Sequence, residues 1–153
     1  MYYMIAEIII EIDPYWVHKK WNIFSLENAD EIDIKIENQY GEDFYGIEKF
    51  TLPFPVSLCC RCKNDILLVN KDWSHALILR ACDRININIF INQIFYSYAI
   101  QKHMIQLHSS LIDFEGHGVL FIGPSGIGKT TMAELWCRYK KALIINGDMS
   151  FIQ

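Results

Sequence analysis

The sequence predicts an α/β protein, α+β overall, with a mostly antiparallel β region at the N-terminus, a bridging helix, and a β-hairpin that leads into a glycine-rich loop and a second helix. Short runs of β-branched and aromatic residues fill the first half of the chain, as they do in strands. Over residues 91–106 the apolar residues recur every three or four positions instead, as in a helix. The order of strand, loop, helix and strand after residue 107 is typical of an α/β unit.

The composition indicates a folded protein. Of the 153 residues, 52% are hydrophobic, 14% aromatic and 21% charged, whereas disordered chains have few aromatic residues and many charges. The 14 Lys and Arg residues against 18 Asp and Glu give a net charge of −4 without a basic block, which argues against nucleic acid as a partner. Asparagines interrupt the most apolar stretch, Ile85–Ile100, so no membrane span is predicted. Because Tyr2–Ile10 carries Glu7 and no basic segment precedes it, it lacks the layout of a secretory signal, and a cytoplasmic protein is expected.

The first 90 residues are expected to form one β-rich region. A strand is predicted for Tyr2–Ile12, and Ile32–Ile36 alternates apolar and charged residues with a period of two. Gly41 and Gly46 predict a loop, and the prolines of Leu52–Pro55 predict an extended segment. Three further strands are expected: Ile66–Asn70, Ala76–Leu79 and Arg84–Phe90.

A bridging helix over residues 91–106 is expected next, and then a second region over residues 107–153. This region is predicted to begin with two strands joined by a tight turn at Glu115–Gly116, and to continue with a helix and a further apolar strand. The elements expected there are Leu107–Phe114, His117–Ile122, Thr131–Lys140 and Ala142–Ile145.

The segment between the second of these strands and the helix matches the phosphate-binding pattern GxxxxGK[ST], a P-loop, at every fixed position. Glycines let the chain turn tightly enough for successive backbone N–H groups to point into one hollow, and the following helix adds the positive end of its dipole. Lys129 is then expected to reach the β- and γ-phosphates of ATP, and the Thr130 hydroxyl to coordinate Mg²⁺. An incidental glycine turn is the alternative. The residues expected to contact the nucleotide are Gly123, Pro124, Ser125, Gly126, Ile127, Gly128, Lys129, Thr130 and Thr131.

Two residues outside the loop are candidates for chemistry. Asp148 follows an apolar strand, where phosphate-binding sites usually have an acid that holds Mg²⁺ directly or through water. The alternative is that Asp148 only makes a turn with Asn146 and Gly147, since these residue types favour turns. His108 is expected either to approach the γ-phosphate or to be a histidine with its own partner at the start of a strand. The candidate catalytic residues are Asp148, Lys129 and His108, and the candidate metal ligands are Thr130 and Asp148.

The five cysteines, an odd number in a chain without a secretory signal, favour reduced thiols over disulfides. Cys59 and Cys62 form a CxxC motif, but a zinc site usually has a second pair of ligands, and only His75 and Cys82 are nearby, at irregular spacing. Ordinary thiols are therefore expected, with a metal or redox role as the alternative. The full set is Cys59, Cys60, Cys62, Cys82 and Cys137.

From residue 107 onward the sequence resembles the HPr kinase/phosphorylase family and its relatives, which include proteins labelled as ATP-type phosphoenolpyruvate carboxykinase-like. The resemblance covers roughly the last third of the chain and is carried by Leu107–Asp113, Gly118–Thr130 and Ile144–Asp148. Its most specific part is the hairpin that enters the phosphate loop, because many other P-loop proteins begin with a parallel strand. The resemblance implies an incomplete HPr-kinase-like core that transfers the γ-phosphoryl group of ATP to a serine of a protein or peptide, with Mg²⁺.

Two departures from the family bear on this expectation. The kinases usually carry paired acids after the strand that ends here at Ile145, whereas this chain has Gly147 and then Asp148, so one of the two roles has no residue. The family would also supply more strands after residue 153, so we expect a fragment of a longer kinase-like protein, with a regulatory or docking module at its N-terminus. A half-covered sheet predicts self-association or binding of a missing C-terminal half. The alternative function is a non-catalytic nucleotide-binding accessory or sensor module.

Overall fold

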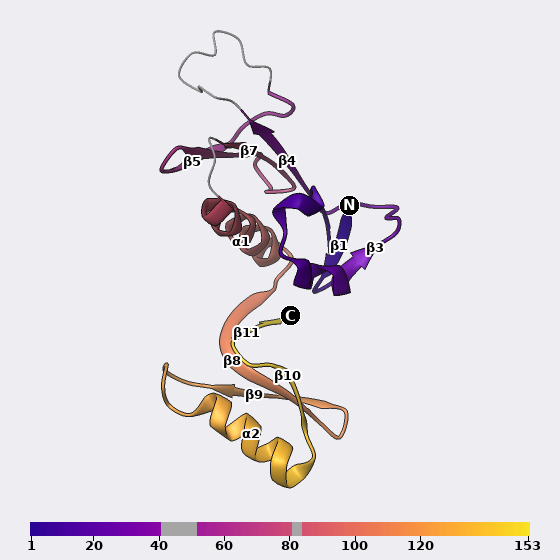
Figure 1. Ribbon diagram of the computed structural model, residues 1–153, viewed down its shortest axis with the longest axis vertical. Helices are drawn as coiled ribbons and strands as arrows, with labels where there is room; N and C mark the ends of the chain where they lie inside the picture. Colours follow the sequence, from indigo (N-terminus) through magenta and orange to yellow (C-terminus); the bar gives the residue numbers. More distant parts are fainter. Residues whose placement is uncertain (41–51, 81–83) are drawn as a thin grey trace. The chain divides into compact units, whose positions relative to one another are not determined.

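The computed structural model describes residues 1–40, 52–80 and 84–153 and has mixed α and β content (Figure 1). The chain divides into two compact units, Met1–Lys102 and His103–Gln153, and each contains its own sheet. The predicted loop around Gly41 and Gly46 lies outside the described residues, as does Cys82.

The first unit contains a seven-stranded sheet. Its strands are β1 (Tyr2–Ile5), β2 (Ile8–Glu11), β3 (Ser25–Leu26), β4 (Ile34–Tyr40), β5 (Leu58–Cys62), β6 (Asp65–Val69) and β7 (His75–Arg80). They lie in the order β3-β1-β2-β4-β7-β6-β5. In the described part of the chain, four of the six pairings are antiparallel, and β4 pairs in parallel with both β2 and β7. The sheet is therefore mixed, and mostly antiparallel as the sequence predicts.

The prediction of a single strand over Tyr2–Ile12 is wrong, because this segment folds back on itself as the hairpin of β1 and β2. Ala6 and Glu7 form the two-residue turn, with φ angles of 50° and 63°. Positive φ at both positions suits the twist of hairpin strands, and glycine or asparagine usually marks such a turn in a sequence. Neither residue type is present here, which hides the turn from sequence analysis. Two short 3-10 helices follow, η1 (Pro14–Trp16) and η2 (Lys19–Phe24).

Helix α1 (Arg84–Gln101) begins and ends earlier than expected, and the predicted strand Arg84–Phe90 is wrong. The alternation of isoleucine with polar residues favoured a strand, but a run this short does not separate a strand from a helix. His103, with φ of 61°, follows the helix, and the next strand begins at Ile105. The buried residues of α1 recur every three or four positions and so lie on one face: Ile87, Phe90, Ile91, Ile94, Phe95, Tyr98 and Ala99.

Asp33 connects α1 to the sheet of the same unit. The Tyr98 hydroxyl donates a hydrogen bond to Asp33 Oδ1 at 2.8 Å, and Lys102 Nζ lies 3.5 Å from the same oxygen. Asp33 Oδ2 accepts a hydrogen bond from the backbone N–H of Ile9, in β2, at 2.9 Å. Burial and, after it, the bond to Asp33 raise the pKa of Tyr98 above its ordinary value of 10.0.

The second unit is a four-stranded sheet around β8 (Ile105–Phe114). Strand β9 (His117–Ile122) pairs with β8 along one edge, β10 (Leu143–Asn146) pairs along the other, and β11 (Met149–Ile152) continues the line of β10. All three are antiparallel to β8, so β9 and β10 run parallel to each other, and α2 (Lys129–Lys140) connects them (Figure 1). The predicted hairpin is confirmed, with its turn at Glu115 and Gly116 (φ 54° and 78°). Strand β11 was not predicted, because four residues are too few to show a period.

Helix α2 packs on one face of this second sheet. Ile112 of β8, Ala133 of α2 and Ala142, just before β10, are buried together. The indole of Trp136 lies edge-on to the ring of Phe114, with ring centroids 5.2 Å apart. This packing fixes α2 against the hairpin and holds its N-terminus at the end of β9.

Candidate functional site

The loop of residues 123–128, which joins β9 to α2, contains two glycines in left-handed conformations. Gly126 has φ of 80° and Gly128 has φ of 101°, angles that side chains with a Cβ rarely adopt. Gly123 is needed for a different reason, because a Cβ there would lie 3.0 Å from Cγ2 of Ile127. The glycines of the pattern thus permit a tight loop that other residues would strain.

The N-terminus of α2 follows the loop directly, and Thr130 and Thr131 in its first turn are exposed. The first hydrogen bond of the helix runs from the N–H of Met132 to the carbonyl of Gly128 at 2.9 Å. Among the described residues, no side chain caps this end of the helix. The first N–H groups of a helix have no partner within it, and together with the helix dipole they attract anions.

Lys129 is the first residue of α2, and only 9% of it is exposed. Its ammonium donates hydrogen bonds to the carbonyls of Gly123 at 2.9 Å and Pro124 at 3.2 Å. A lysine has three N–H donors, and these two bonds use two of them. The side chain is therefore folded back over its own loop, with its charge against the loop carbonyls.

Asp148 lies at the end of the neighbouring strand, and its side chain is 79% exposed. The turn here is made by the side chain of Asn146, whose Oδ1 accepts hydrogen bonds from the N–H groups of Asp148 at 2.9 Å and Met149 at 3.2 Å. The alternative that Asp148 only makes a turn applies to its backbone, and its carboxylate remains available for other contacts. That carboxylate was a predicted metal or catalytic group.

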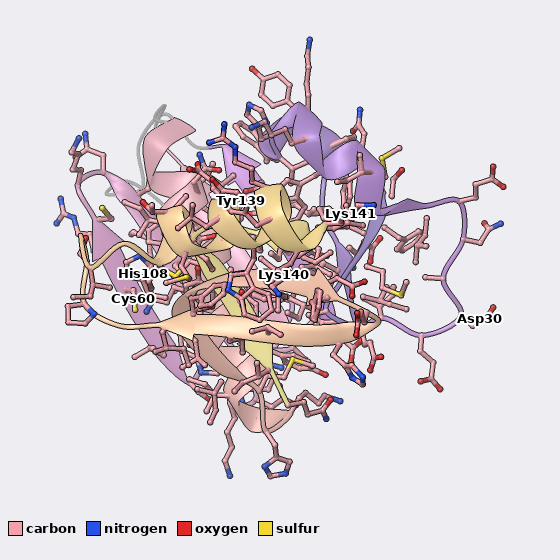
Figure 2. All side chains as sticks on the ribbon, turned by 90° about the horizontal axis from the view of Figure 1, so that it is seen from below. Asp30, Cys60, His108, Tyr139, Lys140 and Lys141 are labelled. Atoms are coloured by element: carbon pink, nitrogen blue, oxygen red, sulfur yellow. The ribbon has the colours of Figure 1, made fainter. Side chains whose placement is uncertain are left out.

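His108 meets this carboxylate across the sheet. The Nε2 atom of His108, in β8, lies 3.2 Å from Oδ1 of Asp148, and the contact is an ion pair when the histidine is protonated. In Figure 2, His108 is labelled beside the loop that joins β9 to α2. Both sequence interpretations of His108 are compatible with this geometry, since the histidine has a partner and also borders the loop.

One cavity of about 380 Å³ brings most of the predicted residues together. Ile127, which points away with 67% of its surface exposed, and Gly123 and Pro124, which hold the lysine through their carbonyls, do not line it. Gly147 lines it without having been proposed as a ligand. Asn146, which the sequence indicated only as a turn residue, does not line the cavity but fixes the backbone of Asp148, which does. The sequence signal for this role is an asparagine two residues before the acid. The lining residues are His108, Ser125, Gly126, Gly128, Lys129, Thr130, Thr131, Gly147 and Asp148.

The oxygen-bearing side chains that line the cavity suit a metal ion that is bound to phosphate. The described residues contain no group of three or more His, Cys, Asp or Glu side chains that could hold a metal ion. Thr130 and Asp148, by contrast, both line the cavity with exposed side chains. Mg²⁺ is typically held by one or two protein oxygens together with phosphate oxygens and water, so these two residues fit Mg²⁺ only as a complex with a nucleotide.

The CxxC motif lies in strand β5, where Cys59 pairs with Leu68 and Cys62 with Asp65. Successive strand residues point to opposite faces, so Cys59 and Cys62 lie on different faces of the sheet. Of the cysteines in the described ranges, none forms a disulfide: Cys59, Cys60, Cys62 and Cys137. This arrangement does not present the two CxxC thiols to one metal ion.

Comparison with known proteins returned no significant match to any protein-family model, curated protein or solved structure. Within the part of the chain that the structure describes, no helix is long and apolar enough to cross a membrane.

Proposed function

We propose that the C-terminal unit is a P-loop nucleotide-binding site that binds Mg²⁺ and ATP and transfers the γ-phosphoryl group to a serine hydroxyl of a protein or peptide. The observation that carries the proposal is the single cavity in which the loop glycines, Lys129 and Thr130 face Asp148 and His108. The resemblance to the HPr kinase/phosphorylase family points to the same reaction class.

The loop side of the cavity matches a polyphosphate. The uncapped helix N–H groups and the Lys129 ammonium supply positive charge from the loop and α2. Nucleotide binding then requires Lys129 Nζ to leave the carbonyls of Gly123 and Pro124 and turn to the β- and γ-phosphates, where a charged acceptor replaces two neutral ones. Mg²⁺ in this site would neutralise developing charge on the phosphates.

The opposite side of the cavity supplies the base. The Asp148 carboxylate takes the proton of the acceptor hydroxyl as the acceptor oxygen forms a bond to Pγ and the bond from Pγ to the bridging oxygen of ADP breaks. His108 Nε2, 3.2 Å from Asp148 Oδ1, holds the carboxylate in place. ADP is the leaving group, and the proton stays on the aspartate until solvent removes it.

A nucleotide sensor without turnover is the second candidate. Gly147 lines the cavity at the position where the kinases of the family carry a second acid. Because that acid is absent, a kinase mechanism requires Asp148 to act both as metal ligand and as base. A sensor that only binds the nucleotide needs no base. In that function, ATP occupancy changes a partner surface and no phosphate is transferred.

The two candidates separate in a transfer assay with the full chain, γ-labelled ATP, Mg²⁺ and a library of serine-containing peptides. The kinase-like function predicts labelled phosphoserine, reduced by about 10²- to 10⁴-fold in Asp148→Asn because a positioned base contributes roughly that much. Asp30→Asn, an exposed aspartate of the first unit, is the matched control. ATP binding with no label on any acceptor would favour the sensor.

A further inference from the structure

A β-bulge lies at the end of β10, next to the cavity. Ile144 pairs with Ile112 and Asn146 pairs with Leu111, so Ile145 is one extra residue on β10. Farther along, Met149 pairs with His108, and the register between the two strands is regular again. Bulges bend a strand and often lie beside functional sites, where they redirect a side chain.

Without the extra residue, the register of Ile144 with Ile112 would continue to place Asp148 opposite His108, whereas after the bulge a regular strand would place the Asp148 side chain on the other face of the sheet. Asp148 stands opposite Ser109, whose N–H donates to the Asp148 carbonyl at 2.9 Å. Opposite residues of antiparallel strands share a face and successive residues alternate, so regular strand geometry would place the Asp148 carboxylate with Ser109 and away from His108. The observed distance of 3.2 Å between Asp148 Oδ1 and His108 Nε2 therefore requires the backbone to leave the strand conformation, and residues 147–148 form a bend between β10 and β11.

The side chain of Asn146 holds this bend. Its Oδ1 accepts hydrogen bonds from the N–H groups of both Asp148 and Met149, at 2.9 and 3.2 Å. An asparagine that binds the backbone two residues ahead stabilises such a turn on its own. On the other side of the bend, the Ser110 hydroxyl lies 3.4 Å from the Gly147 carbonyl.

We infer that Asn146 is a positioning residue. The bulge at Ile145 moves Asp148 out of register with His108, and the bend that Asn146 holds turns the Asp148 carboxylate back toward His108 and into the cavity. Asn146 does not line the cavity itself. Its structural effect stands on the geometry alone, and only its effect on turnover rests on the proposed function. The residue thereby decides whether the single acid of this site faces the phosphates.

The first test reads the His108 ring in the full chain by NMR, with its signals assigned through His108→Gln. Asp148→Asn defines the ring signals of His108 without its carboxylate partner. Asn146→Ala is expected to shift the His108 signals most of the way toward those of Asp148→Asn. Asn146→Asp, which keeps an acceptor oxygen at the same position, is expected to keep signals close to wild type. The matched control is Asn92→Ala, an exposed asparagine on α1.

Any of three results would overturn the inference. The His108 signals could stay at their wild-type positions in Asn146→Ala, they could shift as far in Asn146→Asp as in Asn146→Ala, or they could fail to shift in Asp148→Asn. If Asn146→Ala does not fold, Asn146→Ser replaces it. The shorter hydroxyl acceptor predicts His108 signals between wild type and Asp148→Asn, and wild-type signals there would also overturn the inference.

The second test separates positioning from general stability. Asn146→Ala should lower kcat by about 10- to 100-fold and change the affinity for ATP by less than about twofold, since the loop holds the phosphates. The double variant Asn146→Ala/Asp148→Asn should be no slower than Asp148→Asn, because both changes remove the same group from the site. Additive losses would contradict the positioning role. A wild-type chain without turnover would contradict the proposed function instead, while the His108 signals still decide the role of Asn146.

Discussion

Gly128 has the largest positive φ in the loop, 101°, a backbone angle that residues with a Cβ rarely adopt. An alanine there costs about 1–2 kcal/mol if the loop keeps its shape, so we expect the loop to relax and the N–H groups to turn away from the phosphates. Gly128→Ala should weaken ATP binding by at least about tenfold in calorimetry. Gly118→Ala is the matched control, since a Cβ at Gly118 meets only Leu111 Cδ1 at an ordinary 3.6 Å. Equal affinity in the two variants would mean that the loop conformation does not matter for binding.

Asp148 is expected to bind Mg²⁺ as well as to take the proton of the acceptor hydroxyl. Its exposed carboxylate and the Thr130 hydroxyl are the protein oxygens that fit Mg²⁺ in the cavity. Asp148→Asn should therefore abolish most of the gain in ATP affinity that Mg²⁺ provides, and leave metal-free binding of ADP unchanged. Titrations with and without Mg²⁺ measure both quantities. A full Mg²⁺ effect in Asp148→Asn would remove this residue from the metal site.

At the scale of single residues, the loop was predictable and its partners were less so. The glycines, Lys129 and Thr130 follow from local spacing, because one short segment contains all of them. The contact of His108 with Asp148 joins residues 40 positions apart through the register of β8 with β10 and β11. A local sequence pattern does not predict the register between strands, and here the bulge at Ile145 shifts that register by one residue.

At the scale of elements, α1 depends on its tie to β2 through Asp33. Tyr98→Phe removes the 2.8 Å hydrogen bond to Asp33 and keeps the ring in its buried place. A hydrogen bond to a charged group contributes about 1.5–3 kcal/mol, so we expect the free energy of unfolding to fall by about that amount in urea titrations. Tyr139→Phe, which changes an exposed tyrosine of α2, is the control. A change below about 0.5 kcal/mol in Tyr98→Phe would mean that Lys102 and Ile9 satisfy Asp33 alone.

The same hydroxyl predicts a pH dependence. The pKa of Tyr98 is raised in the folded chain, so the folded state holds this proton more tightly than the unfolded state does. The stability that Tyr98 contributes is complete below its ordinary pKa of 10.0 and is lost as the pH rises through the higher folded value. As the pH rises above the ordinary pKa of 10.0, the free energy of unfolding should therefore fall more steeply in wild type than in Tyr98→Phe. Parallel curves would contradict this assignment.

The elements themselves show where sequence patterns lose information. The β8–β9 hairpin was predictable because Gly116 marks its turn, whereas the β1–β2 hairpin turns at Ala6 and Glu7, two residues that rarely mark one. Over Arg84–Phe90 the period of two was only a coincidence of spacing, and burial of Ile87 and Phe90 in the first unit selected the helix. Packing overrides local preference in such short β-branched runs.

At the scale of the whole molecule, the second unit leaves apolar side chains in water. Leu143 stands opposite Asp113 and Ile122 opposite Ser109, on the face away from Ile112 and α2, and both are more than 60% exposed, at 65% and 63%. We propose that this face drives self-association, since large apolar patches seldom stay bare. Light scattering should find dimers or larger species, and Leu143→Glu should shift them toward monomer. A monodisperse wild-type monomer would contradict the proposal.

The most direct measurement is calorimetric titration of the purified chain with ATP, with and without Mg²⁺, in wild type, Lys129→Ala and Lys140→Ala. Lys129 is a buried cation that lines the cavity, whereas Lys140 is exposed at the far end of the same helix. We predict binding that Mg²⁺ strengthens, weakened at least about tenfold in Lys129→Ala and unchanged in Lys140→Ala. Equal binding by Lys129→Ala and wild type, or no binding by the folded wild-type chain, would contradict a working phosphate site.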